Sequence, residues 1–238
     1  MRMSLALLFA VALAAPASGQ HAHDSQTSAG HAGHAVEMNR RWMAPDVDVA
    51  DWTRRFENPE RDVIANRAPI VAALRLRPGQ TVADVGAGTG AYLAALSSAV
   101  GEGGRVLAVD ISPAFVSHMA ARAEAEGLGN VAAILGSADD PMLPQGGVDV
   151  ILSVNTFHHF EAPEAMLKAM HRALTPGGQL AIVDFDREAA GATEHQRAMA
   201  PLDKAAHVRL IEAHGFRLVE DVAIATLRQN FMLRFVRE

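Results

Sequence analysis

Five short, nearly continuous apolar runs mark the middle of the chain. They span residues 81–85, 105–109, 131–135, 148–154 and 180–185. Their apolar residues follow one another instead of alternating with polar ones, which is typical of parallel strands buried on both faces of a sheet. Two later runs, 216–222 and 227–236, are joined by a short connection and predict an antiparallel hairpin at the C-terminus.

Helix signals lie between these runs. Ser112 followed by Pro113 is typical of an N-cap and a proline at the first helical position, and Gly127 stands where that helix should end. Other helices are expected at residues 91–100, 163–174 and 202–214. Strands that alternate with helices and then end in a hairpin predict an α/β fold with a doubly wound, mostly parallel, seven-stranded sheet.

The chain before the first run divides into three parts. Residues 1–19 are typical of a secretory signal peptide, because Arg2 is their only charge and an apolar run leads to a small-x-small cleavage site at residues 17–19. Residues 20–41 predict a disordered tail. Residues 42–77 predict two short helices, the second over 59–74, which begin a folded domain of residues 42–238.

The signal peptide predicts export to the periplasm or the medium. Its apolar run of about eleven residues is shorter than the roughly 20 residues that span a bilayer. We therefore expect no stable membrane insertion once the peptide is cleaved.

The tail is rich in histidine. Its four histidines are His21, His23, His31 and His34. Neutral imidazoles on a flexible segment can bind zinc, copper or nickel weakly, whereas the simpler interpretation is a solvated spacer. We expect no metal ion in the folded core.

Composition limits the classes of partner and of chemistry. Lys and Arg total 21 against 27 Asp and Glu, a net charge of −6, so the chain has no broad attraction to nucleic acid. The chain has no cysteine, which excludes disulfides, thiolate metal sites and a cysteine nucleophile. Its length of 238 residues suits one α/β domain with short additions.

A glycine-rich turn follows the first apolar run. Residues 82–90 are Val-Ala-Asp-Val-Gly-Ala-Gly-Thr-Gly, and a predicted helix begins directly after them. Gly86, Gly88 and Gly90 permit a tight turn and the close approach of a ligand to the backbone. The position between a strand and a helix predicts a cofactor-binding loop.

Two acidic residues help to choose the cofactor. Asp84 would oppose the pyrophosphate of a dinucleotide, whereas it would favour the ammonium and sulfonium charges of S-adenosylmethionine. Asp110, at the end of the second run, can accept hydrogen bonds from the ribose hydroxyls of either cofactor. The Tyr-x-x-x-Lys pair of short-chain dehydrogenases is missing, because Leu96 stands four residues after Tyr92, the only tyrosine.

Three motifs resemble those of the class I S-adenosylmethionine-dependent methyltransferases, and within them the small-molecule and quinone-biosynthesis enzymes. They are Asp-Val-Gly-Ala-Gly-Thr-Gly at 84–90, Val-Leu-Ala-Val-Asp at 106–110 and Pro-Gly-Gly at 176–178. The similarity runs from about residue 70 to the C-terminus and implies a Rossmann-like fold with S-adenosylmethionine as cofactor. It also implies that Gly86, Gly88 and Gly90 border the methionine part, with Asp84 at its amino group and Asp110 at the ribose.

One motif departs from the resemblance. After the third strand the quinone-biosynthesis subgroup usually has Gly-Asp-Ala, with the carboxylate on the adenine amino group, whereas residues 136–139 here are Gly-Ser-Ala-Asp. Ala138 and Asp139 are accordingly expected beside the adenine, with Asp140 as the alternative. The other interpretation is that both acidic side chains are simply solvated.

Methyl transfer is expected beside the end of the fourth run, where residues 155–160 are Asn-Thr-Phe-His-His-Phe. Ligands bind at this edge of a doubly wound sheet, so Asn155 is expected at the cofactor. His158 or His159 can act as a general base. The resemblance favours a packing role for a histidine here, and alignment alone can suffice for a good nucleophile.

The methyl acceptor is not defined by the sequence. Asp184, Asp186, Trp42, Trp52 and Phe56 either frame a substrate pocket or serve as caps and packing residues. We expect transfer of a methyl group to a small molecule or, as the second interpretation, to a protein side chain. The alternatives are a non-catalytic exported module that binds an adenosyl ligand or a metal, and an NAD(P)-dependent oxidoreductase.

Overall fold

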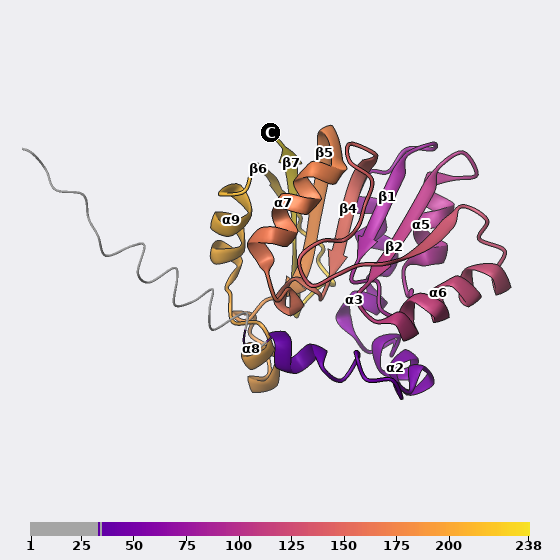
Figure 1. The fold of residues 1–238 in the computed structure, drawn as a ribbon. Helices are drawn as coiled ribbons and strands as arrows, with labels where there is room; N and C mark the ends of the chain where they lie inside the picture. Colours follow the sequence, from indigo (N-terminus) through magenta and orange to yellow (C-terminus); the bar gives the residue numbers. More distant parts are fainter. Residues whose placement is uncertain (1–32, 34) are drawn as a thin grey trace, which may run out of the picture.

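The computed structural model describes residue 33 and residues 35–238, which Figure 1 colours along the chain. The expected signal peptide at 1–19 and the tail histidines His21, His23, His31 and His34 lie outside these residues. Within the described part, no helix is long and apolar enough to cross a membrane.

A seven-stranded sheet forms the centre of the molecule, in the order β3-β2-β1-β4-β5-β7-β6. β1 to β5 pair in parallel, whereas β7 is antiparallel to both β5 and β6. The predicted fold class and C-terminal hairpin are confirmed. The strands are β1 (Thr81–Val85), β2 (Arg105–Asp110), β3 (Val131–Leu135), β4 (Val148–Val154), β5 (Leu174–Phe185), β6 (Phe216–Asp221) and β7 (Asn230–Arg237).

Helices cover both faces of this sheet (Figure 1). On one face Val82 packs with side chains of α4 and α5, and on the other Ala83 packs with side chains of α7 and α9. Successive residues of β1 thus belong to two different cores, which explains why the strands are apolar without alternation. The helices are α2 (Val49–Phe56), α3 (Asp62–Ala65), α4 (Arg67–Ala73), α5 (Leu93–Val100), α6 (Pro113–Ala125), α7 (Pro163–Ala173), α8 (Glu194–Met199) and α9 (Lys204–Glu212).

The predicted helix at 59–74 is broken into α3 and α4 at Asn66. The Asn66 amide donates to Asp62 O at 2.9 Å and to Thr226 O at 3.1 Å. Asp62 Oδ2 accepts the backbone N–H groups of Arg228 and Gln229 from the same connection between β6 and β7. Contacts with a distant segment therefore decide where this helix is interrupted.

The boundary of the predicted disordered tail was wrong for residues 35–41. Residues 35–39 are helical, and Ala35, Met38 and Asn39 are buried. The Asn39 amide donates to His159 O at 3.0 Å and to Glu161 Oε1 at 2.9 Å. These contacts with the segment after β4 hold the end of the predicted tail against the domain.

Two local features also differ from the sequence-based expectation. Ser112 lies at the N-cap of α6 but its hydroxyl donates to Trp42 O at 2.7 Å instead of capping the helix. The short helix α8 was not predicted, although its capping box of Thr193 and Gln196 is a recognisable sequence signal.

The order of the strands positions the candidate site. The chain moves outward from β1 to β2 and β3 on one side, and from β4 to β5 on the other. The carboxyl ends of β1 and β4 therefore flank a topological switch point, where ligands bind in sheets of this kind. The carboxyl ends of β1, β2 and β5 carry Asp84, Asp110 and Asp184, and Asn155 directly follows β4.

Candidate active site

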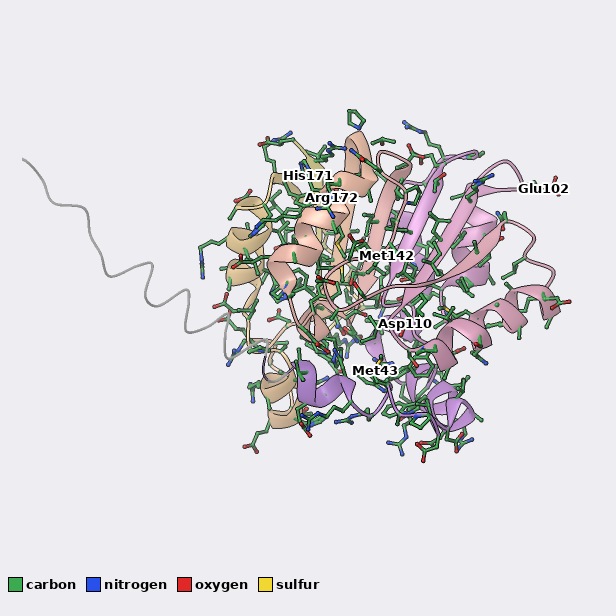
Figure 2. All side chains as sticks on the ribbon, in the orientation of Figure 1. Met43, Glu102, Asp110, Met142, His171 and Arg172 are labelled. Carbon is green, nitrogen blue, oxygen red and sulfur yellow. The ribbon has the colours of Figure 1, made fainter. Side chains whose placement is uncertain are left out.

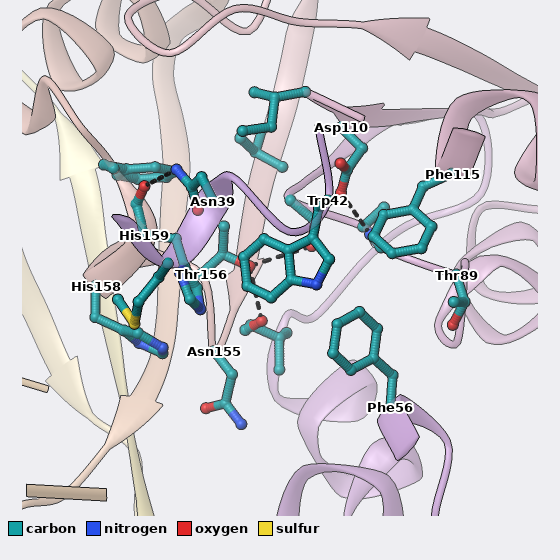
Figure 3. A pocket seen from close by; sticks show the side chains of 18 of the residues that line it. Asn39, Trp42, Phe56, Thr89, Asp110, Phe115, Asn155, Thr156, His158 and His159 are labelled. Carbon is teal, nitrogen blue, oxygen red and sulfur yellow. Dashed lines mark hydrogen bonds between the residues drawn. The ribbon is translucent and has the colours of Figure 1, made fainter. Parts of the chain in front are cut away.

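A cavity of about 470 Å³ opens at the carboxyl ends of β1, β2 and β4. Figure 3 shows side chains that line it. This volume is within the range of roughly 300–1,000 Å³ that is usual for small-molecule sites. Of the residues predicted to bind a cofactor, the cavity is lined by Asp84, Gly86, Gly88, Asp110, Ala138 and Asn155.

The glycine loop is held close to the end of β4. Gly86, Gly88 and Gly90 have φ angles of +79°, +56° and +83°, a region that favours glycine. The Thr156 hydroxyl donates to Gly86 O at 3.1 Å, and a Cβ at Gly86 would lie 2.0 Å from Thr156 Cγ2. The sequence pattern did not single out Thr156, whose side chain packs on Gly86 and leaves no room for a larger residue there.

Gly86→Ala should lower cofactor affinity by at least about tenfold, because the new Cβ would displace Thr156 or the loop. Isothermal titration calorimetry with S-adenosylmethionine measures this change. Gly79→Ala is the matched control, since Gly79 also has a positive φ of +89° but a Cβ added there would meet nothing within 4 Å. Equal affinities of the two variants would contradict the steric argument.

Gly90 and Asp139 do not line the cavity, unlike the other predicted cofactor residues. Gly90 is the last glycine of the loop, and a Cβ there would meet Leu93 Cδ1 at 2.6 Å. Asp139 is exposed, and its Oδ1 accepts a hydrogen bond from Ser137 Oγ at 2.7 Å. The alternative residue, Asp140, pairs with Arg172 at 3.1 Å and also lies outside the cavity.

Two buried carboxylates face the same cavity. Asp84 is 2% exposed and Asp110 is 9% exposed, and neither forms an ion pair within residues 35–238. Asp110 Oδ2 accepts the Gly88 N–H at 2.8 Å and its Oδ1 accepts the Ser112 N–H at 2.9 Å. Asp110 therefore connects the glycine loop to the start of α6.

The environment of these carboxylates disfavours their charged form. Burial, and then the neighbouring Asp110, raise the pKa of Asp84 to about 7. Burial raises the pKa of Asp110 to about 6, against backbone hydrogen bonds that include those from Ser112 and Gly88. A ligand that carries positive charge would offset the cost of ionising this pair.

Affinity for S-adenosylmethionine should therefore rise with pH. Below about pH 7 Asp84 is protonated in the free protein and loses the charge that attracts an ammonium group. We expect the Kd at pH 5.5 to exceed that at pH 7.5 by about tenfold. Calorimetry at both values measures the ratio, and Asp84→Asn should flatten it while lowering affinity at pH 7.5. A Kd independent of pH in the wild type would refute the assignment.

An aromatic cluster from the N-terminal segment closes one side of the cavity. The ring centroid of Trp42 lies 5.7 Å from that of Trp52 and 6.1 Å from that of Phe56. Phe56 in turn lies 5.8 Å from Phe115 of α6. The cavity is thus lined by Trp42, Trp52 and Phe56, which agrees with the first of their two expected roles, that of framing a pocket. Phe115 lines it as well.

A charged cluster fixes α2 beside the glycine loop. Glu57 Oε1 accepts the Thr89 hydroxyl at 2.8 Å and pairs with Arg122 at 2.6 Å. Arg122 also donates to Thr89 O at 3.2 Å and pairs with Glu126. These contacts join α2, the loop and α6, so the aromatic side chains of the N-terminal segment are held over the cavity.

His158 forms a pair with a carboxylate behind the cavity wall. Its Nδ1 lies 2.7 Å from Asp184 Oδ1, and its backbone N–H donates to Asp184 Oδ2 at 3.2 Å. Asp184 is fully buried, and His207 Nε2 lies 3.8 Å from its Oδ2. Burial alone would raise the pKa of Asp184, but the charge and hydrogen bonds of His158, with a contribution from His207, hold it well below its ordinary value.

This pairing leaves the other ring nitrogen of His158 for a ligand. His158 lines the cavity, whereas Asp184 does not. His158 Nε2 is buried and has no hydrogen-bond partner among the described residues. A buried nitrogen without a partner costs about 1–3 kcal/mol, which a hydroxyl group of a ligand would recover.

The two adjacent histidines have different surroundings. The His159 ring lies between that of His158, with a centroid separation of 4.2 Å, and the indole of Trp42, at 4.7 Å. In Figure 3 the two histidines lie on the same side of Trp42. Asp186 was another candidate for the pocket, but it lies outside the cavity and accepts the Glu188 N–H at 3.0 Å.

The residues present fit S-adenosylmethionine. A cation is favoured by the two buried carboxylates, and a close approach to the backbone is permitted at Gly86 and Gly88. No group of three or more His, Asp or Glu side chains in the described part of the chain could hold a metal ion.

Comparisons with known proteins identify a similar domain. Residues 82–178 match the family model of a methyltransferase domain. Nocamycin O-methyltransferase of Saccharothrix syringae is 37% identical over 106 residues, which are 44% of this chain and 38% of that protein. A ubiquinone/menaquinone biosynthesis C-methyltransferase of Vibrio vulnificus (strain YJ016) is 32% identical over 112 residues, 47% of this chain and 43% of that protein. The chain thus spans less than half the length of these curated relatives.

Solved structures extend the similarity over the fold. A SAM-dependent methyltransferase from Aquifex aeolicus superposes with a TM-score of 0.67 at 27% identity, over 73% of this chain and 90% of that one. A putative methyltransferase from Haloferax volcanii, solved with the Trm112 activator, also has a TM-score of 0.67 at 20% identity, over 79% and 95% of the two chains. Together with the matched domain, the Aquifex aeolicus structure supports S-adenosylmethionine as the cofactor. Residues 82–178 are therefore similar to a methyltransferase domain, and the fold around them is similar to that of an S-adenosylmethionine-dependent methyltransferase.

Proposed function

We propose that this protein transfers a methyl group from S-adenosylmethionine to a hydroxyl group of a small molecule. The observation that carries the proposal is the His158–Asp184 pair, because its histidine lines the cavity that also contains Asp84, Asp110 and the glycine loop. An imidazole held by a carboxylate is the usual arrangement of a general base.

The chain's residues have separate roles in this proposal. Asp84 receives the ammonium group of the cofactor, and Asp110 accepts hydrogen bonds from the ribose hydroxyls while it fixes the loop at Gly88. Ser137 and Ala138 line the cavity where the resemblance places the adenine, and Phe115 adds an apolar wall. Bound S-adenosylmethionine would supply an electrophilic methyl group on its sulfonium, with the neutral thioether as the leaving group.

His158 supplies the proton chemistry. Its Nδ1–H donates to Asp184, which fixes the tautomer with the lone pair on Nε2. Nε2 takes the proton of the acceptor hydroxyl as the oxygen attacks the methyl carbon, and Asp184 stabilises the imidazolium that forms. This assignment differs from the packing role favoured by sequence, and it rests on the Asp184 contact.

The relatives leave the acceptor atom open. One is named as an O-methyltransferase and another as a C-methyltransferase. A buried imidazole base favours an acceptor that must lose a proton, and a hydroxyl attacks poorly until it does. A cavity with apolar aromatic walls favours a small molecule over a protein side chain.

Two measurements test the proposed function. Calorimetry with the purified protein should give binding of both S-adenosylmethionine and S-adenosylhomocysteine. A library of small hydroxyl compounds, incubated with methyl-labelled cofactor, should then give label in an ether product identified by mass spectrometry. Failure of the cofactor to bind, or transfer of label only to carbon or nitrogen, would overturn the proposal.

We further propose that the mature protein works outside the cytoplasm, as the sequence of residues 1–19 predicts. S-adenosylmethionine made in the cytoplasm would then have to leak out or be transported, because its permanent charges oppose crossing a bilayer. Mass spectrometry of protein recovered from the cell envelope should find an N-terminus at or near Gln20. An intact N-terminus in the cytoplasmic fraction would exclude export.

A further inference from the structure

A second pocket of about 340 Å³ adjoins the cavity and shares lining residues with it. It lies between the α2–α3 corner, the end of β5, α8 and the start of β7. The residues that line both spaces include Arg61, Phe56, Asn155, Phe185 and Met199. They also include a second arginine, Arg55, which pairs with Asp51 at 2.7 Å. The two pockets therefore share a wall that includes residues next to His158, whose ring centroid lies 5.4 Å from that of Phe185.

Arg61 places a guanidinium group without a counterion at this junction. Its Nη1 donates to Phe56 O at 2.8 Å, and its Cζ lies 5.6 Å from the centre of the Phe56 ring. It forms no ion pair within residues 35–238, and burial lowers its pKa. The Asp62 carboxylate, which also lines the second pocket, accepts the backbone N–H groups of Arg228 and Gln229 instead.

Two side-chain amides of the second pocket also present donors. The Asn155 side-chain oxygen accepts from Asn230, and the Gln229 side-chain oxygen accepts from Gln196. Each of these two amide oxygens is therefore occupied, and the NH₂ groups of Asn155 and Gln229 remain for a ligand. A cation with two amide donors matches the oxygens of a carboxylate.

We propose that the second pocket is an acceptor subsite in which Arg61 binds a carboxylate, so that the methyl acceptor is a hydroxy acid. The proposal rests on the methyltransferase function proposed above. The hydroxyl of the acid would reach His158 from the main cavity, while its carboxylate would lie on Arg61, Asn155 and Gln229. Phe56, Phe185 and Met199 provide apolar contacts for a ring between the two ends.

Hydroxybenzoates and the matching hydroxybenzamides test this subsite, because each pair differs mainly in charge. The three positional isomers of each are titrated by calorimetry into protein saturated with S-adenosylhomocysteine. At least one acid should bind about tenfold or more tightly than its amide. Arg61→Gln should reduce that preference to less than about threefold, and Arg61→Lys should retain part of it.

The control variant is Arg217→Gln, which removes an exposed arginine that pairs with Glu238 far from both pockets. It should keep the preference for the acid, and thermal unfolding should show that all variants are folded. Equal binding of acids and amides, or no binding of any acid to the saturated wild type, would overturn the subsite. So would a loss of S-adenosylhomocysteine affinity in Arg61→Gln, because Arg61 would then bind the carboxylate of the cofactor. Failure of the wild type to bind S-adenosylhomocysteine at all would instead refute the proposed function.

Discussion

Replacing His158 with alanine should lower kcat by roughly 10²- to 10⁴-fold, the usual contribution of a general base. The Kd of S-adenosylmethionine should change little, because the cofactor is assigned to Asp84, Asp110 and the glycine loop. Asp184→Asn should also lower kcat strongly, since the amide no longer stabilises the imidazolium or selects its tautomer. Steady-state assays with the identified acceptor measure kcat, and calorimetry measures the Kd.

Two controls separate base catalysis from packing. Added imidazole should restore part of the activity of His158→Ala, because it can occupy the space of the lost ring and accept the proton. His214→Ala should have no effect, since His214 lies at the end of α9 and contacts Leu210 O. A folded His158→Ala protein with nearly normal kcat would return His158 to the packing role that the resemblance favours.

Asp110→Ala should weaken S-adenosylmethionine binding about ten- to a hundredfold, which corresponds to about 1.5–3 kcal/mol. The variant loses the proposed acceptor of the ribose hydroxyls and also leaves the N–H groups of Gly88 and Ser112 without their partner. Asp110→Asn should be affected less, because its amide oxygen can still accept one of these hydrogen bonds.

The matched control for Asp110 lies at the opposite end of the sheet. Asp149 Oδ2 accepts the Thr81 N–H at 2.8 Å, so Asp149→Ala also removes a carboxylate from a backbone donor of this sheet. It should lower thermal stability without changing cofactor affinity. If calorimetry gave equal Kd values for the Asp110→Ala and wild-type proteins, Asp110 would not be a ribose ligand.

The two sets of predictions also test different halves of one site. Asp110 belongs to the cofactor half, built on β1, β2 and the glycine loop, and Figure 2 labels it among the side chains there. His158 belongs to the acceptor half, built after β4 and against β5. A variant in one half should therefore change either the Kd of the cofactor or kcat, but not both to the same extent.

The sheet and most of the cofactor half could be predicted from local sequence patterns. Buried strands need apolar residues on both faces, and a loop with positive φ angles needs glycine, so both leave a pattern within a few neighbouring residues. The same local logic located Asp84 and Asp110 at the strand ends, where the structure has them beside the cavity. The capping box of Thr193 and Gln196 was a further local signal that was overlooked.

The contacts between residues distant in the chain could not be predicted in this way. The His158–Asp184 contact joins residues 26 positions apart, and the Asn39–His159 contact joins residues 120 positions apart. The break at Asn66 and the shape imposed by Thr156 on Gly86 likewise depend on segments remote in the chain. Hydrogen bonds and packing between strand ends are set by the register and order of the sheet, and no periodicity within a single segment encodes them.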